Sequence, residues 1–280
     1  PAMKNQKNAL RASYFPLSRI DVHDIRQMYA VYSQYYERTS WDIFLRDLSK
    51  KTGAFLIRRK ADNRVVGFST ILTNDMDING RPARGVFSGD TIIEREYWGS
   101  RVLQLAFYKF MITEKVRNPG RTIHWLLISK GFKTYLLLAN NFQKFYPHPE
   151  GKCADLSGVV DAYCREMFPE YYDGNRQILD FGDDYQCLKG DVAEITEAMR
   201  RSNARIRFFE DCNPEWRRGT ELPCVGIVDW ELLRSYAIDF ALKPVSMGRV
   251  DASRQPQPVS RPAHGVEGLT PHLAVVRRTA

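Results

Sequence analysis

Residues 85–93 read GVFSGDTII and residues 122–129 read TIHWLLIS, and these two stretches carry the strongest structural signal in the chain. Both are short runs rich in β-branched and aromatic residues, the composition of buried strands. Between them, residues 98–116 have apolar side chains at helical spacing, and Asn118-Pro119-Gly120 ends that pattern. A strand, a helix and a second strand in this order predict an α/β fold.

Upstream of these strands the sequence predicts a small antiparallel meander. Residues 54–59 and 65–72 have strand composition, and the turn signals Asp62-Asn63 and Asn79-Gly80 separate them from each other and from the next strand. Before the meander the apolar spacing is helical. Asp21 and Ser40 are the expected N-caps of two helices there.

The C-terminal half alternates helix and strand signals less regularly. Apolar spacing predicts helices over 130–146, 156–167, 191–201 and 229–241, and strands over 205–210 and 223–228. From residue 243 the chain is rich in Pro, Gly, Arg and Ser without periodicity, which is typical of a flexible or partner-ordered tail. We therefore expect one domain over residues 3–242 and a tail over 243–280, with Met3 as the native start after a cloning remnant.

Composition limits the class of protein. No run of 18 uncharged apolar residues is present, so we expect a soluble, cytoplasmic protein without a membrane span. The five cysteines are widely spaced and form no CxxC pair, which favours reduced thiols and predicts no metal site. A thiol nucleophile stays open as an alternative.

The chain is basic, with a net charge of +8, which favours an anionic partner. Nucleic acid, a phosphorylated cofactor and an acidic carrier protein all fit this charge. Nucleic acid is the least favoured, because no stripe of Lys and Arg is interleaved with aromatic residues.

The order of expected elements over residues 21–228 resembles the GCN5-related N-acetyltransferase (GNAT) superfamily. The resemblance implies a mixed, mostly antiparallel sheet flanked by helices, with residues 147–203 as a helical insertion before the last two strands. It also implies that strands 85–93 and 122–129 splay apart to admit the acyl donor. Gly89, inside an apolar strand, agrees with this, because an interior glycine marks a bulge or a close ligand approach. A plain packing glycine is the alternative.

The family's phosphate-binding signature, [Q/R]-x-x-G-x-[G/A], is degenerate here. Residues 96–103 read EYWGSRVL, and either alignment of this tract places a bulky side chain at a position that the family keeps small. The resemblance then implies that Gly89, Arg95, Ser100 and Arg101 bind the donor. The donor is an acyl thioester, either acyl-CoA or, as in the N-acyl amino acid synthases and acyl-homoserine-lactone synthases that this pattern is similar to, acyl carrier protein.

Acyl transfer to an amine needs a base, and the resemblance places it in strand 85–93. Asp90 is the first candidate and Glu94 its substitute, because a carboxylate in an apolar strand is costly without a role or a partner. Tyr146, expected near the end of helix 130–146, is the candidate acid for the leaving thiolate. Each side chain also has a purely structural interpretation, a salt bridge for Asp90 and core packing for Tyr146.

His124, in strand 122–129, and His148, after helix 130–146, are weaker candidates for proton transfer or acceptor contact. The resulting hypothesis is an N-acyltransferase that acts on the amine of an amino acid or other small molecule. The alternatives are an inactive GNAT-like binding module for a protein or nucleic acid and, last, an aminoacyl-tRNA-dependent transferase.

Overall fold

A computed structural model describes residues 9–182, 187–188 and 194–242, and the expected tail over 243–280 lies outside these residues. One seven-stranded sheet dominates, in the order β1-β3-β4-β5-β6-β11-β7. All neighbouring strands are antiparallel except β5 and β6, which are parallel. The strands are β1 (Leu10–Pro16), β3 (Gly53–Arg59), β4 (Val65–Ile78), β5 (Arg81–Ile93), β6 (Thr122–Ser129), β7 (Phe145–Tyr146) and β11 (Leu222–Val228).

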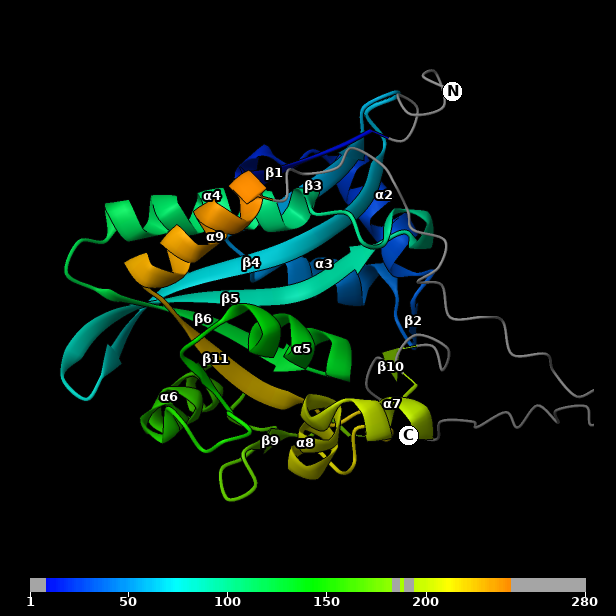
Figure 1. Cartoon of the computed structure of the whole chain (residues 1–280). Coiled ribbons are helices and arrows are strands. Elements are labelled where there is room, and N and C mark those ends of the chain that lie inside the picture. The colour runs from blue at the N-terminus through cyan, green and yellow to red at the C-terminus, as the bar shows by residue number, and fades with distance from the viewer. Residues whose placement is uncertain (1–8, 183–186, 189–193, 243–280) are drawn as a thin grey trace, which may run out of the picture. The chain divides into compact units, whose positions relative to one another are not determined.

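Helices cover both faces of the sheet (Figure 1). On one face lie α4 (Val102–Arg117), α5 (Phe132–Asn141), α8 (Ala204–Cys212) and α9 (Trp230–Leu242). On the other lie α2 (Val22–Tyr32), α3 (Trp41–Ser49) and α6 (Ser157–Met167). The sheet residues alternate between two buried clusters, so that Phe55 packs under α4 while its neighbours Ala54 and Leu56 pack under α2 and α3. The predicted fold class, a mixed and mostly antiparallel sheet flanked by helices, is confirmed.

The remaining elements are short. Besides the 3-10 turns η1 (Leu17–Arg19), η2 (Arg95–Tyr97) and η3 (Ala154–Leu156), they are β2 (Tyr36–Glu37), β8 (Tyr172–Asp173), β9 (Ile178–Leu179), β10 (Cys187–Leu188) and α7 (Glu197–Ser202). None of the helices in the described ranges is long and apolar enough to cross a bilayer.

Both predicted N-caps are confirmed. The Asp21 side chain accepts a hydrogen bond from the Asp24 amide at 2.7 Å, and the Ser40 hydroxyl accepts one from the Ile43 amide at 3.3 Å. Strand β1 was not predicted from the sequence. It is an edge strand, and most of its side chains are only partly buried, so its apolar alternation is weak.

Two predictions in the C-terminal half are wrong. Residues 205–210 lie in helix α8, whose first amides are capped by the Asn203 side chain and whose buried residues Ile206 and Phe209 are spaced for a helix. The short run RIRFFE fits both periods, and packing selects the helix. The helix expected over 130–146 ends at Asn141, because the next residues turn to pair as β7 with β11. Only one strand of the main sheet, β11, therefore follows the insertion.

Candidate active site

Strands β5 and β6 pair in parallel from Ala83 opposite Thr122 to Ser88 opposite Leu127. Beyond this point the pairing stops, although both strands continue, β5 against β4 and β6 against β11. We call the gap between the unpaired ends of β5 and β6 the mouth. The carboxyl ends of parallel strands are where open α/β sheets commonly bind ligands, so the mouth is the candidate site.

A β-bulge lies at the mouth. Ser69 pairs with Thr91 and Ile71 with Ser88, so the two residues Gly89 and Asp90 stand opposite the single residue Thr70. Of the interpretations that the sequence left open for Gly89, the structure shows the bulge. A bulge re-aims the side chains beside it, and here it occurs in the strand segment that has lost its β6 partner.

Gly89 has no room for a side chain. A Cβ atom at this position would lie 2.4 Å from Thr70 Oγ1, and Thr70 is buried with a β-branched side chain that moves little. We expect Gly89→Ala to lower the free energy of unfolding by about 1–3 kcal/mol, through overpacking. Urea unfolding followed by circular dichroism measures this.

The matched control is Gly158→Ala in helix α6, where a Cβ would meet no atom within 4 Å. That change should stabilise the protein by about 0.5–1 kcal/mol, because alanine loses less conformational freedom in a helix. If both substitutions had the same effect, Gly89 would be an ordinary strand glycine.

Asp90 lies in a charged group of side chains. Burial raises the pKa of its carboxyl group above the usual range, the ammonium groups of Lys51 and Lys130 oppose that rise, and the carboxylate of Asp47 adds to it. The residue as a whole is only partly buried. A carboxylate with a raised pKa is a better proton acceptor at neutral pH than an ordinary aspartate.

Lys51 follows helix α3 and reaches the bulge from the sheet face that α2 and α3 cover. Its Nζ atom lies 5.3 Å from the ring centroid of Phe87 and would lie 3.5 Å from a Cβ atom at position 89. The hydroxyl of Thr70 is buried beside it and makes no hydrogen bond. The Lys51 ammonium group and the Thr70 hydroxyl therefore both lie against Gly89, the residue before Asp90.

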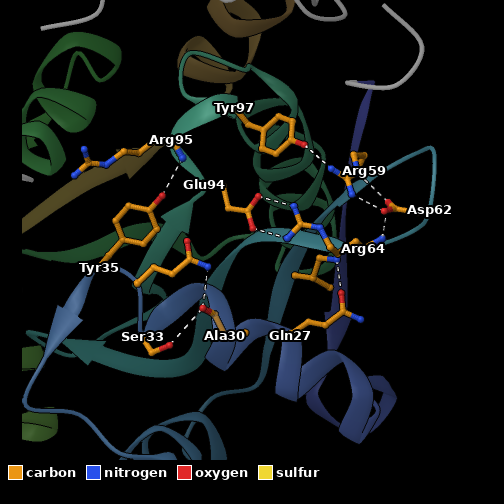
Figure 2. Close-up of polar contacts among 12 residues, drawn as sticks. Gln27, Ala30, Ser33, Tyr35, Arg59, Asp62, Arg64, Glu94, Arg95 and Tyr97 are labelled. Atoms are coloured by element: carbon orange, nitrogen blue, oxygen red, sulfur yellow. Dashed lines mark hydrogen bonds and ion pairs between the residues drawn. The ribbon is translucent and has the colours of Figure 1, made fainter. Parts of the chain in front are cut away.

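Glu94 is held in an ion pair. Both of its carboxylate oxygens accept hydrogen bonds from Arg64, at 2.5 and 2.7 Å, and its side chain is only 12% exposed (Figure 2). This pair fastens the end of β5 to the start of β4. Because the ion pair uses both oxygens, we do not carry Glu94 forward as the substitute base.

Tyr146 is not at the end of a helix, and this part of the prediction is wrong. It lies on β7 opposite Val225 of β11, and its hydroxyl donates to the side-chain oxygen of Gln177 in the insertion. Strands β11 and β6 separate β7 from β5, so the structure does not bring Tyr146 together with Asp90.

The turn before α4 holds the three predicted donor-binding residues besides Gly89. The Arg95 amide donates to Tyr35 Oη at 2.9 Å, and its side chain points away from the Glu94 ion pair (Figure 2). Gly99 has a φ of 85°, which suits glycine, and Ser100 Oγ accepts from the Val102 amide at 3.5 Å. Arg101 pairs with Asp239 of α9 and thus faces that helix.

The sequence analysis did not identify a cationic patch that Arg95 and Lys133 form around the ring of Trp98. The Arg95 guanidinium lies 5.7 Å and the Lys133 ammonium 4.8 Å from the Trp98 ring centroid. Lys133 is in the first turn of α5, after β6, while Arg95 follows β5. The two cations therefore converge from opposite sides of the mouth.

The weaker candidates lie elsewhere. His124 pairs with Gly85, three residues before the end of the parallel ladder, and burial lowers its pKa to about 4, so it stays neutral. His148 packs against Phe145 with ring centroids 4.5 Å apart.

Burial raises the pKa of Cys164 to about 12 and of Cys212 to about 11, which disfavours either thiolate as a nucleophile.

Within the described residues no group of three or more His, Cys, Asp or Glu side chains is placed to hold a metal ion. No family model and no curated protein matches the sequence.

Comparison with solved structures found weak partial likenesses. One is a probable N-acyltransferase from Enterococcus faecalis V583, with 13% identity, a TM-score of 0.36 and a match that spans 49% of this chain and 33% of that one. Another is the GNAT family N-acetyltransferase YhbS from Escherichia coli in complex with CoA, with 16% identity, a TM-score of 0.31 and coverage of 44% and 64%. A third is an aminoglycoside acetyltransferase from an uncultured soil metagenomic sample, with 14% identity, a TM-score of 0.32 and a match that spans 46% of this chain and 84% of that one. Each of these three matches covers under half of this chain.

Proposed function

We propose that this chain is a GNAT-like N-acyltransferase that moves an acyl group from an acyl thioester to the amine of an amino acid or other small molecule. The observation that supports this most is the bulge at the mouth. It places Asp90 in the part of β5, after Ser88, that pairs with β4 but no longer with β6. A donor arm can lie along such an edge and bond to its backbone groups.

The side chains at the mouth suit this chemistry. Asp90 takes a proton from the acceptor ammonium group, and the resulting amine attacks the thioester carbonyl carbon. A carbon–nitrogen bond forms, the carbon–sulfur bond breaks, and the proton that the attacking nitrogen then loses goes to the leaving thiolate, while protonated Asp90 returns its proton to solvent. Backbone N–H groups of β5 stabilise the carbonyl oxygen as it becomes negative. Tyr146 has no part in this scheme.

For the donor we propose acyl-CoA or acyl carrier protein, each of which carries a phosphorylated pantetheine arm. Arg95 and Lys133 supply positive charge beside the start of α4, where helix amides point outward. Ser100 lies at the same turn, while Arg101 is turned toward Asp239. The net charge of +8 suits either donor, since both are anionic.

Donor binding is the first test. We expect CoA, acyl-CoA or acyl-loaded carrier protein, at about 100 times its Kd, to raise the free energy of unfolding by about 2.7 kcal/mol, because a ligand that binds only the folded state stabilises it. A thermal-shift series compares the wild type with Arg95→Gln/Lys133→Gln, which should bind the donor more weakly and therefore show a smaller stabilisation. The matched control is Arg176→Gln, which removes an exposed arginine that pairs with Glu215. If no donor shifted the wild type, an inactive binding module would become the better interpretation.

A further inference from the structure

A second buried carboxylate, Glu221, lies near the mouth and has no role in the proposed acyl transfer. Glu221 immediately precedes β11 and is 4% exposed, and its Oε1 atom lies 3.1 Å from Lys130 Nζ. Lys130 immediately follows β6, and its side chain is 13% exposed. The ion pair thus joins the ends of two neighbouring strands on the side of the mouth opposite β5.

Several contacts fix Glu221 in place. Its backbone exchanges two hydrogen bonds with Leu179 of β9, at 2.9 and 3.0 Å, so the insertion holds it. The residue before it, Thr220, is locked by Asn213, which is fully buried and donates to the Thr220 carbonyl at 2.9 Å. The loop over residues 213–221, which follows α8, thereby holds Glu221 at a defined place.

Stability alone does not account for such a pair. Removing two charges from water costs about as much as their attraction returns, and apolar residues of similar size often stabilise a protein as well or better. A buried ion pair beside a candidate site is therefore better explained by what it does to the third charged group there. That group is Asp90. Asp90 lies two residues beyond Ser88 and Lys130 three residues beyond Leu127, the last pair of the parallel ladder, so both lie at the same end of β5 and β6. Lys130 attracts the Asp90 carboxylate, and the carboxylates of Asp90 and Glu221 repel each other.

We propose that Lys130 and Glu221 are positioning residues for Asp90, and that Glu221 controls how much of the Lys130 charge Asp90 receives. This inference rests on the proposed function for its catalytic meaning, but the coupling itself is a property of the fold. With Glu221 ionised, Lys130 is shared between two carboxylates, and Asp90 keeps the high proton affinity that a base needs. The other charged groups facing Asp90 are Lys51, which follows α3, and Asp47 within α3.

The test is a direct titration of Asp90 by carbon-detected NMR of side-chain carboxyl groups, with the signal assigned by its loss in Asp90→Asn. In Glu221→Gln, the negative charge that repels the Asp90 carboxylate is removed, and Lys130 no longer forms an ion pair with residue 221. We expect the Asp90 midpoint to fall by about 0.5–1 pH unit. In Lys130→Met/Glu221→Gln, the cation is gone as well, and the midpoint should rise again above that of Glu221→Gln.

Glu215→Gln is the control, because Glu215 lies in the same loop but pairs with exposed Arg176 and Arg218. It should leave the Asp90 midpoint where it is in the wild type. An Asp90 midpoint that stays the same in folded Glu221→Gln, or that fails to rise in the double variant, overturns the proposal. The titration needs no substrate, so a positive coupling without any acyl transfer would reject only the proposed function, and transfer without coupling would reject only this inference.

Discussion

Replacing Asp90 by Asn should lower kcat/KM for the proposed amine acylation by about 100- to 10,000-fold, the range that a positioned general base contributes. The physical reason is that an amide cannot take the proton from the acceptor ammonium group. Steady-state kinetics with the donor found in the thermal-shift series measures the loss. In the wild type we expect kcat/KM to fall on the acid side as Asp90 becomes protonated, with a midpoint above the usual aspartate range.

The same substitution should not lower stability. Burial raises the pKa of Asp90 in the folded state above its value in the unfolded chain, so ionised Asp90 makes a net unfavourable contribution to stability at pH values above the folded pKa. That contribution shrinks as pH falls below the folded pKa and is gone below the unfolded pKa. Asn carries no charge, so we expect an unchanged or higher melting temperature. Glu94→Gln is the contrasting control, with reduced stability and near-normal chemistry, because Glu94 is paired with Arg64. Full activity in Asp90→Asn would remove Asp90 from the mechanism.

The second large effect concerns the attachment of α2 to the sheet. Asp24 accepts two hydrogen bonds from Arg58 of β3, at 2.8 and 2.6 Å, and their side chains are only 11% and 9% exposed. Asp24→Ala leaves a buried guanidinium group without its partner, which costs about 3–5 kcal/mol. The melting temperature should fall by on the order of 10 °C for a chain of this size.

Two further variants separate the ion pair from simple packing. Asp24→Leu/Arg58→Met replaces both charges by apolar groups and should recover most of the lost stability. Glu215→Ala breaks the exposed pair with Arg176, and its cost should stay below about 1 kcal/mol. Calorimetry of the three proteins measures these differences. A loss as small in Asp24→Ala as in Glu215→Ala would mean that the buried pair does not hold α2 in place.

The sequence by itself determined the elements whose signals are local. The strands at 54–59 and 122–129 were predicted because burial on both faces leaves a short, continuous apolar run. The helix caps Asp21 and Ser40 were predicted because a cap is one side chain bonded to a nearby amide. Gly89 could also be predicted as a bulge, since a glycine weakens the interior of an apolar strand and often marks a place where the backbone bends. The basic net charge and the carboxylate Asp90 could be read from the sequence because both follow from residue identities alone.

Tertiary structure decided what depends on partners far along the chain. The run RIRFFE is helical because its apolar side chains pack in that form. Tyr146 lies in a strand because it pairs with β11, which lies about 80 residues later in the chain. Lys130 and Glu221 are separated by 91 positions and meet only because β6 and β11 are neighbours in the sheet. A single sequence shows periodicity but not which strands lie side by side, so the charges that set the behaviour of Asp90 became visible only in the folded chain.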